Sequence, residues 1–228
     1  METIIIKISI MLVPALLAVI LHEVSHGYVA ERFGDPTARL LGRLNLNPLR
    51  HLDPIGTIAV FIFGFGWARP VPVNAGNLRH PQRDMIWVAL AGPLTNLSLA
   101  VLSALLLRAI GLFEPVLGGD SELFLQLSRP LRMMAAFSLY INVLLGTFNL
   151  LPIPPLDGGR VLSGLLPPRQ AALLSKLEPF GFVLILFLVF FTDIWKLVLS
   201  PLIGSLVKLL AGPEWQLVQQ AMQFLFGN

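Results

Sequence analysis

The sequence Leu21-His22-Glu23-Val24-Ser25-His26 closes an apolar run that begins at Ile4. It follows the H-E-x-x-H pattern, in which two histidines stand four residues apart. On a helix, this spacing puts both imidazoles on one face, about one turn apart. His22 and His26 can then take two corners of a tetrahedral zinc site, with Glu23 beside them to transfer protons. The pattern therefore predicts a zinc-binding helix.

The composition predicts an integral membrane protein. Of the 228 residues, 55% are hydrophobic and 13% are charged, whereas soluble domains carry about 25% charged residues. The mean hydropathy is +0.77. The length fits one compact helical bundle, so we expect a single membrane protease domain over residues 1–228. We expect no cleavable signal peptide, because the first apolar run continues directly into His22.

The residue types restrict both the metal ligands and the partners. The chain contains no cysteine, which excludes disulfides and thiolate zinc sites. Any metal must therefore be held by His, Asp or Glu. The net charge is only +3, and the basic residues are mostly arginines of one loop. Since nucleic-acid binding needs a basic stripe on a water-exposed face, we expect the lipid bilayer, and no nucleic acid, as a partner.

The apolar segments predict an all-α polytopic membrane protein. We expect a bundle of about 4–6 transmembrane segments with a short membrane-associated β or re-entrant element. A final amphipathic segment, 215–226, is expected on the membrane surface. The catalytic core is expected over about 1–165, and C-terminal membrane segments over about 166–228. The expected spans are 4–30, 85–110, 131–151, 173–192 and 194–211.

The polar portion, residues 31–84, is rich in arginine. Arginine-rich loops stay in the cytoplasm, so the metal site should lie toward that side. A helix that rises about 1.5 Å per residue from Ile4 has indeed crossed about 27 Å by His22. Short strands are expected at 39–45 and 68–73. The apolar segment between them is too short to span and should dip into the membrane and return.

A zinc site needs a third protein ligand, and Asp157 is the best-placed carboxylate. It follows a proline-rich stretch, 152–155, which cannot form a regular helix. Non-helical backbone at membrane depth is tolerated where it is buried or lines a water cavity. The alternative role of Asp157 is to cap a helix that starts at Gly158. The remaining histidines, His51 and His80, lie in the arginine-rich loop and are expected to be solvated.

The chain resembles a known family, the site-2 proteases. The resemblance rests on pairing His22-Glu23-Val24-Ser25-His26 with Asn149-Leu150-Leu151-Pro152-Ile153-Pro154-Pro155-Leu156-Asp157-Gly158. These motifs are similar to the H-E-x-x-H and N-x-x-P-x-x-x-x-D-G signatures of that family of intramembrane zinc metalloproteases. They occur in the family's order, and the spans that link them cover most of residues 1–165. The chain resembles a small bacterial-type member that lacks room for a PDZ or CBS-type domain.

The resemblance implies roles for individual residues. His22, His26 and Asp157 would bind one Zn²⁺ per chain, and Glu23 would be the catalytic acid/base. Asn149 would hold the substrate or stabilise the oxyanion. The implied function is hydrolysis of peptide bonds of membrane-spanning proteins within or near the bilayer, as in regulated intramembrane proteolysis at the cell membrane.

Three further residues match recurrent family features. Gly64 and Gly66 bracket Phe65 in the segment expected to re-enter the membrane, which the resemblance implies guides the substrate as a strand. Asn96 follows Gly92-Pro93 and matches a recurrent family position. Its role is either a substrate contact or an interhelical hydrogen bond.

Two other functional classes stay open. One is another membrane zinc protease that combines H-E-x-x-H with a downstream glutamate, although Glu178 and Glu214 lack the helical partner pattern. The other is a non-enzymatic metal-binding membrane protein or transporter. A transporter would more naturally carry polar groups at mid-membrane in several helices and often an inverted repeat, and neither feature is visible in the sequence.

Overall fold

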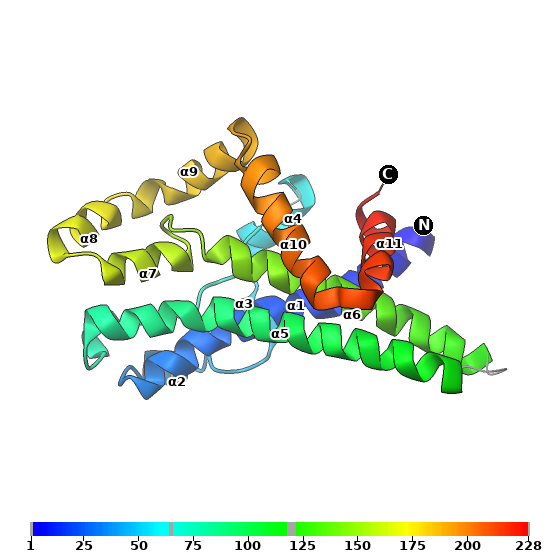
Figure 1. Ribbon diagram of the computed structural model, residues 1–228. Coiled ribbons are helices and arrows are strands. Elements are labelled where there is room, and N and C mark those ends of the chain that lie inside the picture. Colours follow the sequence, from blue (N-terminus) through cyan, green and yellow to red (C-terminus); the bar gives the residue numbers. More distant parts are fainter. Residues whose placement is uncertain (1, 64–65, 118–121, 228) are drawn as a thin grey trace. The chain divides into compact units, whose positions relative to one another are not determined.

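Helices dominate the computed structural model, which describes residues 2–63, 66–117 and 122–227 (Figure 1). These ranges contain no β-strand; their extended backbone pairs in one isolated antiparallel bridge, Leu52 with Ala68. The all-α class is therefore confirmed. The α-helices are α1 (Glu2–Arg32), α2 (Thr37–Leu40), α3 (Pro48–His51), α4 (Pro54–Phe63), α5 (Pro81–Leu117), α6 (Glu122–Asn149), α7 (Asp157–Leu165), α8 (Pro168–Ser175), α9 (Glu178–Phe191), α10 (Ser200–Ala211) and α11 (Trp215–Phe226).

Several of these helices are long and apolar enough to cross a membrane. A further pair, Pro168–Ser175 with Glu178–Val189, passes the same test together but is bent by 47°. The protein is therefore a multi-pass membrane protein, as the composition predicts. Among the described residues, the four candidate spans are Thr3–Arg32, Pro81–Glu114, Gln126–Asn149 and Trp195–Phe226.

The helices form two compact units. We call the first the bundle unit; it comprises Met1–Ala18, Asn96–Thr147 and Ile194–Asn228. We call the second the site unit; it comprises Val19–Thr95 and Phe148–Asp193. The chain passes between the units within α1, α5 and α6, so each of these helices contributes residues to both.

The bundle unit is held by apolar packing and by interhelical hydrogen bonds. Ile10 of α1, Phe137 of α6 and Leu225 of α11 form a buried cluster. Ser103 of α5 donates to Ser138 of α6 across 2.8 Å. Since lipid removes the hydrophobic drive between helices, such packing and hydrogen bonds carry their association.

The last helix, α11, has the amphipathic pattern and the bounds that the sequence predicts. Its buried residues, Val218, Ala221 and Leu225, follow helical spacing along one face. Leu225 belongs to the cluster with Ile10 and Phe137. This apolar face is therefore covered by the unit's own core.

Arginines of the long helices in the bundle unit contact the end of α10 and the turn that follows it, Gly212–Glu214. Arg132 of α6 pairs with Glu114 of α5 and lies 2.7 Å from Glu214. Arg108 donates to the carbonyl oxygen of Leu210, at 2.6 Å, near the C-terminus of α10. Helix α5 continues to Leu117 and α6 begins at Glu122.

In the site unit, a buried carboxylate organises the loop after α1. Asp35 has no exposed surface and accepts hydrogen bonds from Asn74 N at 2.7 Å and from Asn77 Nδ2 at 2.9 Å. Thr37 N donates to the same carboxylate at 3.1 Å. These bonds connect the start of the loop with its end, near Pro81, where α5 begins.

The strands expected at 39–45 and 68–73 are not formed. The first range begins in helix α2 and continues into a turn at Gly42, whose φ is +63°. In the second range only Ala68 pairs. Pro70 and Pro72 have no N–H group, so they cannot take part in a regular strand ladder.

Two residues that flank the segment expected to re-enter the membrane are paired with each other. The Leu52–Ala68 bridge joins its ends, and Arg69 N donates to His51 O at 2.8 Å. Between them the chain forms helix α4. Gly64 lies outside the described residues.

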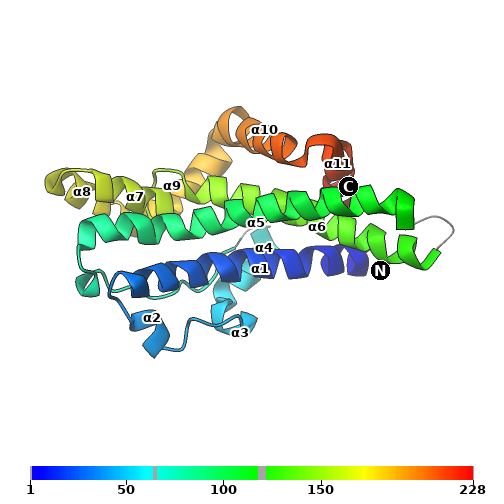
Figure 2. The same ribbon diagram turned by 60° about the horizontal axis from the view of Figure 1, so that its bottom comes forward.

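The first half of α5 and α7 lie side by side in the site unit (Figure 2). Gln82 Nε2 donates to the carbonyl oxygens of Gly164, at 3.1 Å, and of Leu166, at 2.9 Å. This contact fixes α7, whose first residue is Asp157. The helix that carries the predicted third ligand is thus anchored to the helix that follows the arginine-rich loop.

Candidate metal centre

The two histidines of the H-E-x-x-H stretch lie on one face of α1. Their ring centroids are 4.8 Å apart, and each residue is only 7% exposed. Helix α1 runs without interruption through His22 and His26. The four-residue spacing therefore places both imidazoles where the sequence predicts them.

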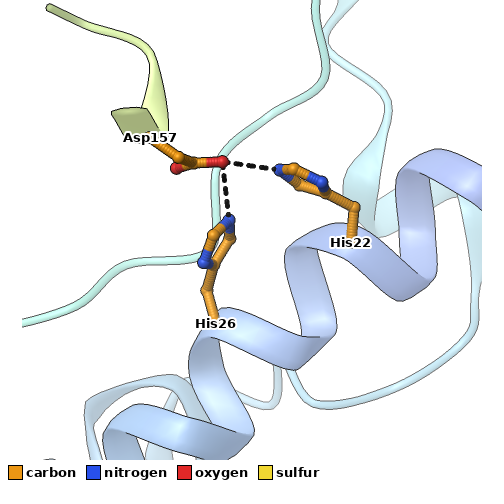
Figure 3. A group of neighbouring side chains, drawn as sticks. All are labelled: His22, His26 and Asp157. Atoms are coloured by element: carbon orange, nitrogen blue, oxygen red, sulfur yellow. Dashed lines mark ion pairs between the residues drawn. The ribbon is translucent and has the colours of Figure 1, made fainter. Parts of the chain in front are cut away.

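The structure brings Asp157 to these two histidines (Figure 3). One carboxylate oxygen, Oδ2, lies 3.1 Å from His22 Nε2 and 3.5 Å from His26 Nε2. Asp157 is 6% exposed. The three residues offer donor atoms that all lie within 4.8 Å of one another, and the described part of the chain contains no second such group.

Asp157 does not cap a helix that starts at Gly158. Helix α7 begins at Asp157 itself, Leu156 occupies the N-cap position, and no side chain caps the helix. A carboxylate in the first turn is stabilised by the helix dipole, but its side chain stays available to another partner. The capping alternative is therefore not what the structure shows.

A backbone carbonyl fixes the orientation of one imidazole. His26 Nδ1 lies 2.7 Å from the carbonyl oxygen of Val88 in α5. Because a carbonyl oxygen only accepts hydrogen bonds, Nδ1 must carry the proton. In the neutral ring, Nε2 then presents its lone pair toward Asp157, which is the form that binds a metal.

Gly92 of α5 leaves space beside both imidazoles. A Cβ atom at this position would lie 2.5 Å from His22 Nε2 and 2.5 Å from His26 Nε2. Any larger residue would therefore fill the volume next to the two donor nitrogens. The sequence places Gly92 beside Pro93 in α5 but does not reveal this role.

The donor set fits zinc. Two imidazole nitrogens and one carboxylate oxygen are the ligands of a catalytic zinc site, which keeps a further position open. Asp157 Oδ2 is buried and, among the described residues, accepts no hydrogen bond. A buried carboxylate oxygen without a hydrogen bond is costly unless a cation or proton compensates it. A zinc ion held by the three side chains would provide that compensation.

Glu23 is held by a neighbouring segment of the loop. Val71 N donates to Glu23 Oε2 at 2.8 Å. Arg43 is close enough to Glu23 for an electrostatic interaction. Burial, and then the neighbouring Arg69, lower the pKa of the Arg43 guanidinium, whereas Glu23 acts in the opposite direction. The sequence reveals none of these partners.

The other predicted site residues have different surroundings. Asn96 belongs to the bundle unit, is fully buried, and donates to Ala18 O at 3.1 Å and to Asn142 Oδ1 at 2.8 Å. These are bonds between helices. Asn149 is the last residue of α6 and is partly buried in the site unit. Gly66 is exposed just before the bridge at Ala68.

The expectation of a solvated His51 is wrong. It has no exposed surface, and its Nε2 lies 2.8 Å from Asn45 O. His80 is exposed, as expected. Of the two glutamates considered as alternative ligands, Glu178 lies 3.9 Å from Arg160 and Glu214 pairs with Arg132.

Spanning helices around a buried cluster of two histidines and one aspartate, with a glutamate beside it, define the class of membrane metalloproteases. Comparison with known proteins agrees with this class. Residues 10–191 match the profile of peptidase family M50. The chain belongs to this family, the site-2 proteases, and is a zinc metalloprotease.

Relatives of this chain carry corresponding names. It is 40% identical to "Putative zinc metalloprotease YwhC" of Bacillus subtilis (strain 168), over 81% of this chain and 81% of that protein. It is 34% identical to "Putative zinc metalloprotease Rip2" of Mycobacterium tuberculosis (strain ATCC 25618 / H37Rv), over 76% of this chain and 64% of that protein. No solved structure matches the chain.

Proposed function

We propose that this protein is an intramembrane protease that hydrolyses peptide bonds of membrane-spanning substrate proteins within or near the bilayer, in regulated intramembrane proteolysis. One zinc ion per chain is held by His22, His26 and Asp157. The observation that carries this proposal is the convergence of these three side chains within 4.8 Å, two of them on the candidate span Thr3–Arg32.

The chemistry divides between the metal and the protein. Bound zinc supplies a Lewis acid, which activates water for attack near neutral pH. Glu23 takes the proton of the attacking water and returns it to the leaving amine. Val71 N–H occupies Oε2 of this carboxylate, which leaves Oε1 for the proton transfer. Asn149 stabilises the charge that develops on the carbonyl oxygen or holds the substrate.

A helical substrate hides its peptide bonds in its own hydrogen-bond ladder, so it must unwind locally before it is cut. Gly64 and Gly66 belong to the element that guides the unwound segment as a strand. Support for this role comes from the bridge between Leu52 and Ala68, which makes the intervening segment leave and return at one place. Main-chain pairing of this kind tolerates many side chains and therefore suits varied substrates.

The active site faces the cytoplasmic side of the cell membrane. Two features support this orientation. His22 and His26 lie in the C-terminal part of the first candidate span, Thr3–Arg32. The loop that follows this span is rich in arginine, and such loops remain in the cytoplasm.

The test combines metal analysis with cleavage of a membrane-embedded reporter. The purified protein is reconstituted in liposomes with a single-span helical reporter that carries a tag at each end. We expect cleavage within the reporter's span, mapped by mass spectrometry. Glu23→Gln should keep zinc yet lose at least about 100-fold in rate, the usual contribution of a general acid/base.

Two outcomes would contradict the proposal. One is cleavage by Glu23→Gln at the wild-type rate. The other is a wild-type protein that retains zinc but cuts none of a panel of reporters whose spans differ in helix-breaking residues. The second outcome would favour a non-enzymatic metal-binding role.

A further inference from the structure

Glu23 is positioned by a loop segment in which two of the four residues are prolines and therefore have no N–H group. The sequence Arg69-Pro70-Val71-Pro72 contains two prolines, so Val71 has the only N–H group between Arg69 and Val73. That group donates to Glu23 Oε2 at 2.8 Å. The position of this one donor therefore determines where the Glu23 carboxylate is held.

Main-chain hydrogen bonds attach this segment only at its first residue, where Arg69 N donates to His51 O at 2.8 Å, because Pro70 and Pro72 have no N–H group. Arg43 provides a second attachment, closer to Val71. Its Nη2 atom donates to Arg69 O at 2.9 Å and to Pro70 O at 3.3 Å. Both acceptors directly precede Val71. Arg43 is itself anchored, since its own N–H donates to Ala38 O at 2.8 Å.

Packing brings this segment against the face of α1 that carries Glu23. Gly27 lies one helical turn after Glu23. A Cβ atom at Gly27 would lie 3.0 Å from Val71 Cγ1 and 2.5 Å from Leu44 Cδ2. The loop therefore approaches α1 so closely at this turn that only glycine fits. Val71 is buried in this contact.

We propose that Arg43 is a positioning residue of the protease: by holding the carbonyl groups of Arg69 and Pro70, it fixes the Val71 N–H group that orients Glu23. This inference rests on the proposed function for Glu23. Arg43 itself does not touch the metal ligands in the described contacts. Its loss should therefore affect proton transfer while the zinc site stays intact.

The first experiment compares reporter cleavage by Arg43→Met and Arg43→Lys. The methionine variant keeps side-chain bulk but has no donor. We expect its kcat to fall at least about tenfold, because small displacements of a catalytic group cost one to two orders of magnitude. KM should change less than about threefold, and zinc content should stay at the wild-type level. Lysine should restore most of the rate, because both hydrogen bonds come from one nitrogen atom.

Arg50→Met is the matched control. Arg50 donates to Gly42 O at 2.9 Å in the same loop. Its positive charge acts on Arg43, but none of the described hydrogen bonds joins its side chain to the segment around Val71. It should keep the wild-type kcat. An equal loss of kcat in Arg50→Met and Arg43→Met would show a general effect on the loop and would overturn the proposal.

A second measurement is independent of catalysis. In protein labelled with ¹⁵N-valine, amide exchange at Val71 should be at least about tenfold faster in Arg43→Met than in wild type, and unchanged in Arg50→Met. Unchanged exchange in Arg43→Met would overturn the role of Arg43. If the wild-type protein cuts no reporter, the proposed function fails, while this exchange measurement still decides whether Arg43 positions Val71.

If Arg43→Met does not fold, substitutions of Val71 test the same proposal. Val71→Pro removes the N–H group directly. Val71→Ala keeps the N–H group and removes the packing of the valine side chain, so it controls for the loss of that packing. The proline variant should lose kcat as strongly as Arg43→Met, and the alanine variant clearly less. The double variant with Arg43→Lys and Val71→Pro should have the same low kcat as Val71→Pro alone, because the lysine then has no Val71 N–H group to position. Equal rates in the proline and alanine variants would contradict the proposal.

Discussion

His26 Nδ1 lies 2.7 Å from the backbone carbonyl oxygen of Val88, a residue 62 positions further along the chain. This contact joins α1 to α5 at the metal centre and sets which nitrogen of His26 faces Asp157. It comes from the main chain, so a substitution of Val88 leaves it in place. The geometry of the centre therefore depends on how closely α5 approaches α1, and Gly92 controls that approach.

Gly92→Ala should abolish zinc binding without unfolding the protein. The added methyl group would lie 2.5 Å from the Nε2 atoms of His22 and His26, so it takes the volume next to both donors. We expect zinc affinity to fall at least about 100-fold, a larger loss than that from an outer-sphere change. Zinc content after dialysis, measured by mass spectrometry, checks this.

Gly204→Ala serves as the control, because a Cβ atom there would meet nothing within 4 Å. It should bind zinc as the wild type does. Full zinc occupancy in Gly92→Ala would show that α5 can move away from the histidines at little cost.

Asp157→Ala should also release zinc, because only two of the three proposed ligands remain. We expect the metal to be lost to a mild chelator that leaves wild-type protein loaded. Glu178→Gln is the informative comparison, since Glu178 is one of the downstream glutamates considered as an alternative ligand. It should keep full zinc occupancy. Zinc loss in Glu178→Gln alone would reverse the assignment.

Asn96→Ala should lower stability and leave substrate affinity unchanged. Asn96 bonds to Ala18 O and Asn142 Oδ1 between helices of the bundle unit. Loss of such bonds costs about 1–3 kcal/mol in buried sites and about 0.6 kcal/mol on average in membranes. Unfolding in detergent and KM for the reporter provide the two readouts.

Asn142→Ala should produce a similar loss of stability, and the double variant should lose little more than either single change. A raised KM with unchanged stability in Asn96→Ala would instead favour the substrate contact.

Asp35→Asn should destabilise the site unit in a pH-dependent manner. Burial raises the pKa of the Asp35 carboxyl, but hydrogen bonds from Thr37, Asn77 and Asn74 outweigh it, so the pKa lies below its usual range. A lowered folded-state pKa contributes stability above the unfolded pKa of about 4, and this contribution is lost as the pH falls further. We expect a cost of about 1–3 kcal/mol at pH 7 that shrinks below pH 4. Denaturant unfolding at both pH values measures it, and a pH-independent difference would contradict the charge-based account.

The sequence predicts those parts of the fold and site that depend on side-chain type and spacing. The apolar run from Ile4 gives the first helix, and the H-E-x-x-H spacing gives the shared face of His22 and His26. Asp157 is predictable because it follows a proline-rich break at the end of a span. The histidine–aspartate cluster therefore follows in outline from the order and type of the residues alone.

What the sequence does not predict depends on the backbone. The contacts of Val88 O and Val71 N with the site come from main-chain atoms, and every residue type supplies the carbonyl oxygen and every type except proline the N–H group. The strand at 68–73 is expected because β-branched valines favour extended structure. It does not form because the interleaved Pro70 and Pro72 lack the N–H donors of a strand ladder. His51 is buried because its ring bonds to Asn45 O, a contact that composition alone does not indicate.

The separation of the metal ligands along the chain has a consequence for biogenesis. His22 and His26 are synthesised first, and Asp157 emerges only after α5 and α6. Until then the nascent chain offers zinc two of its three proposed ligands. A chain that ends before Asp157 should therefore bind zinc more weakly than the full chain, because a catalytic zinc site uses three protein ligands.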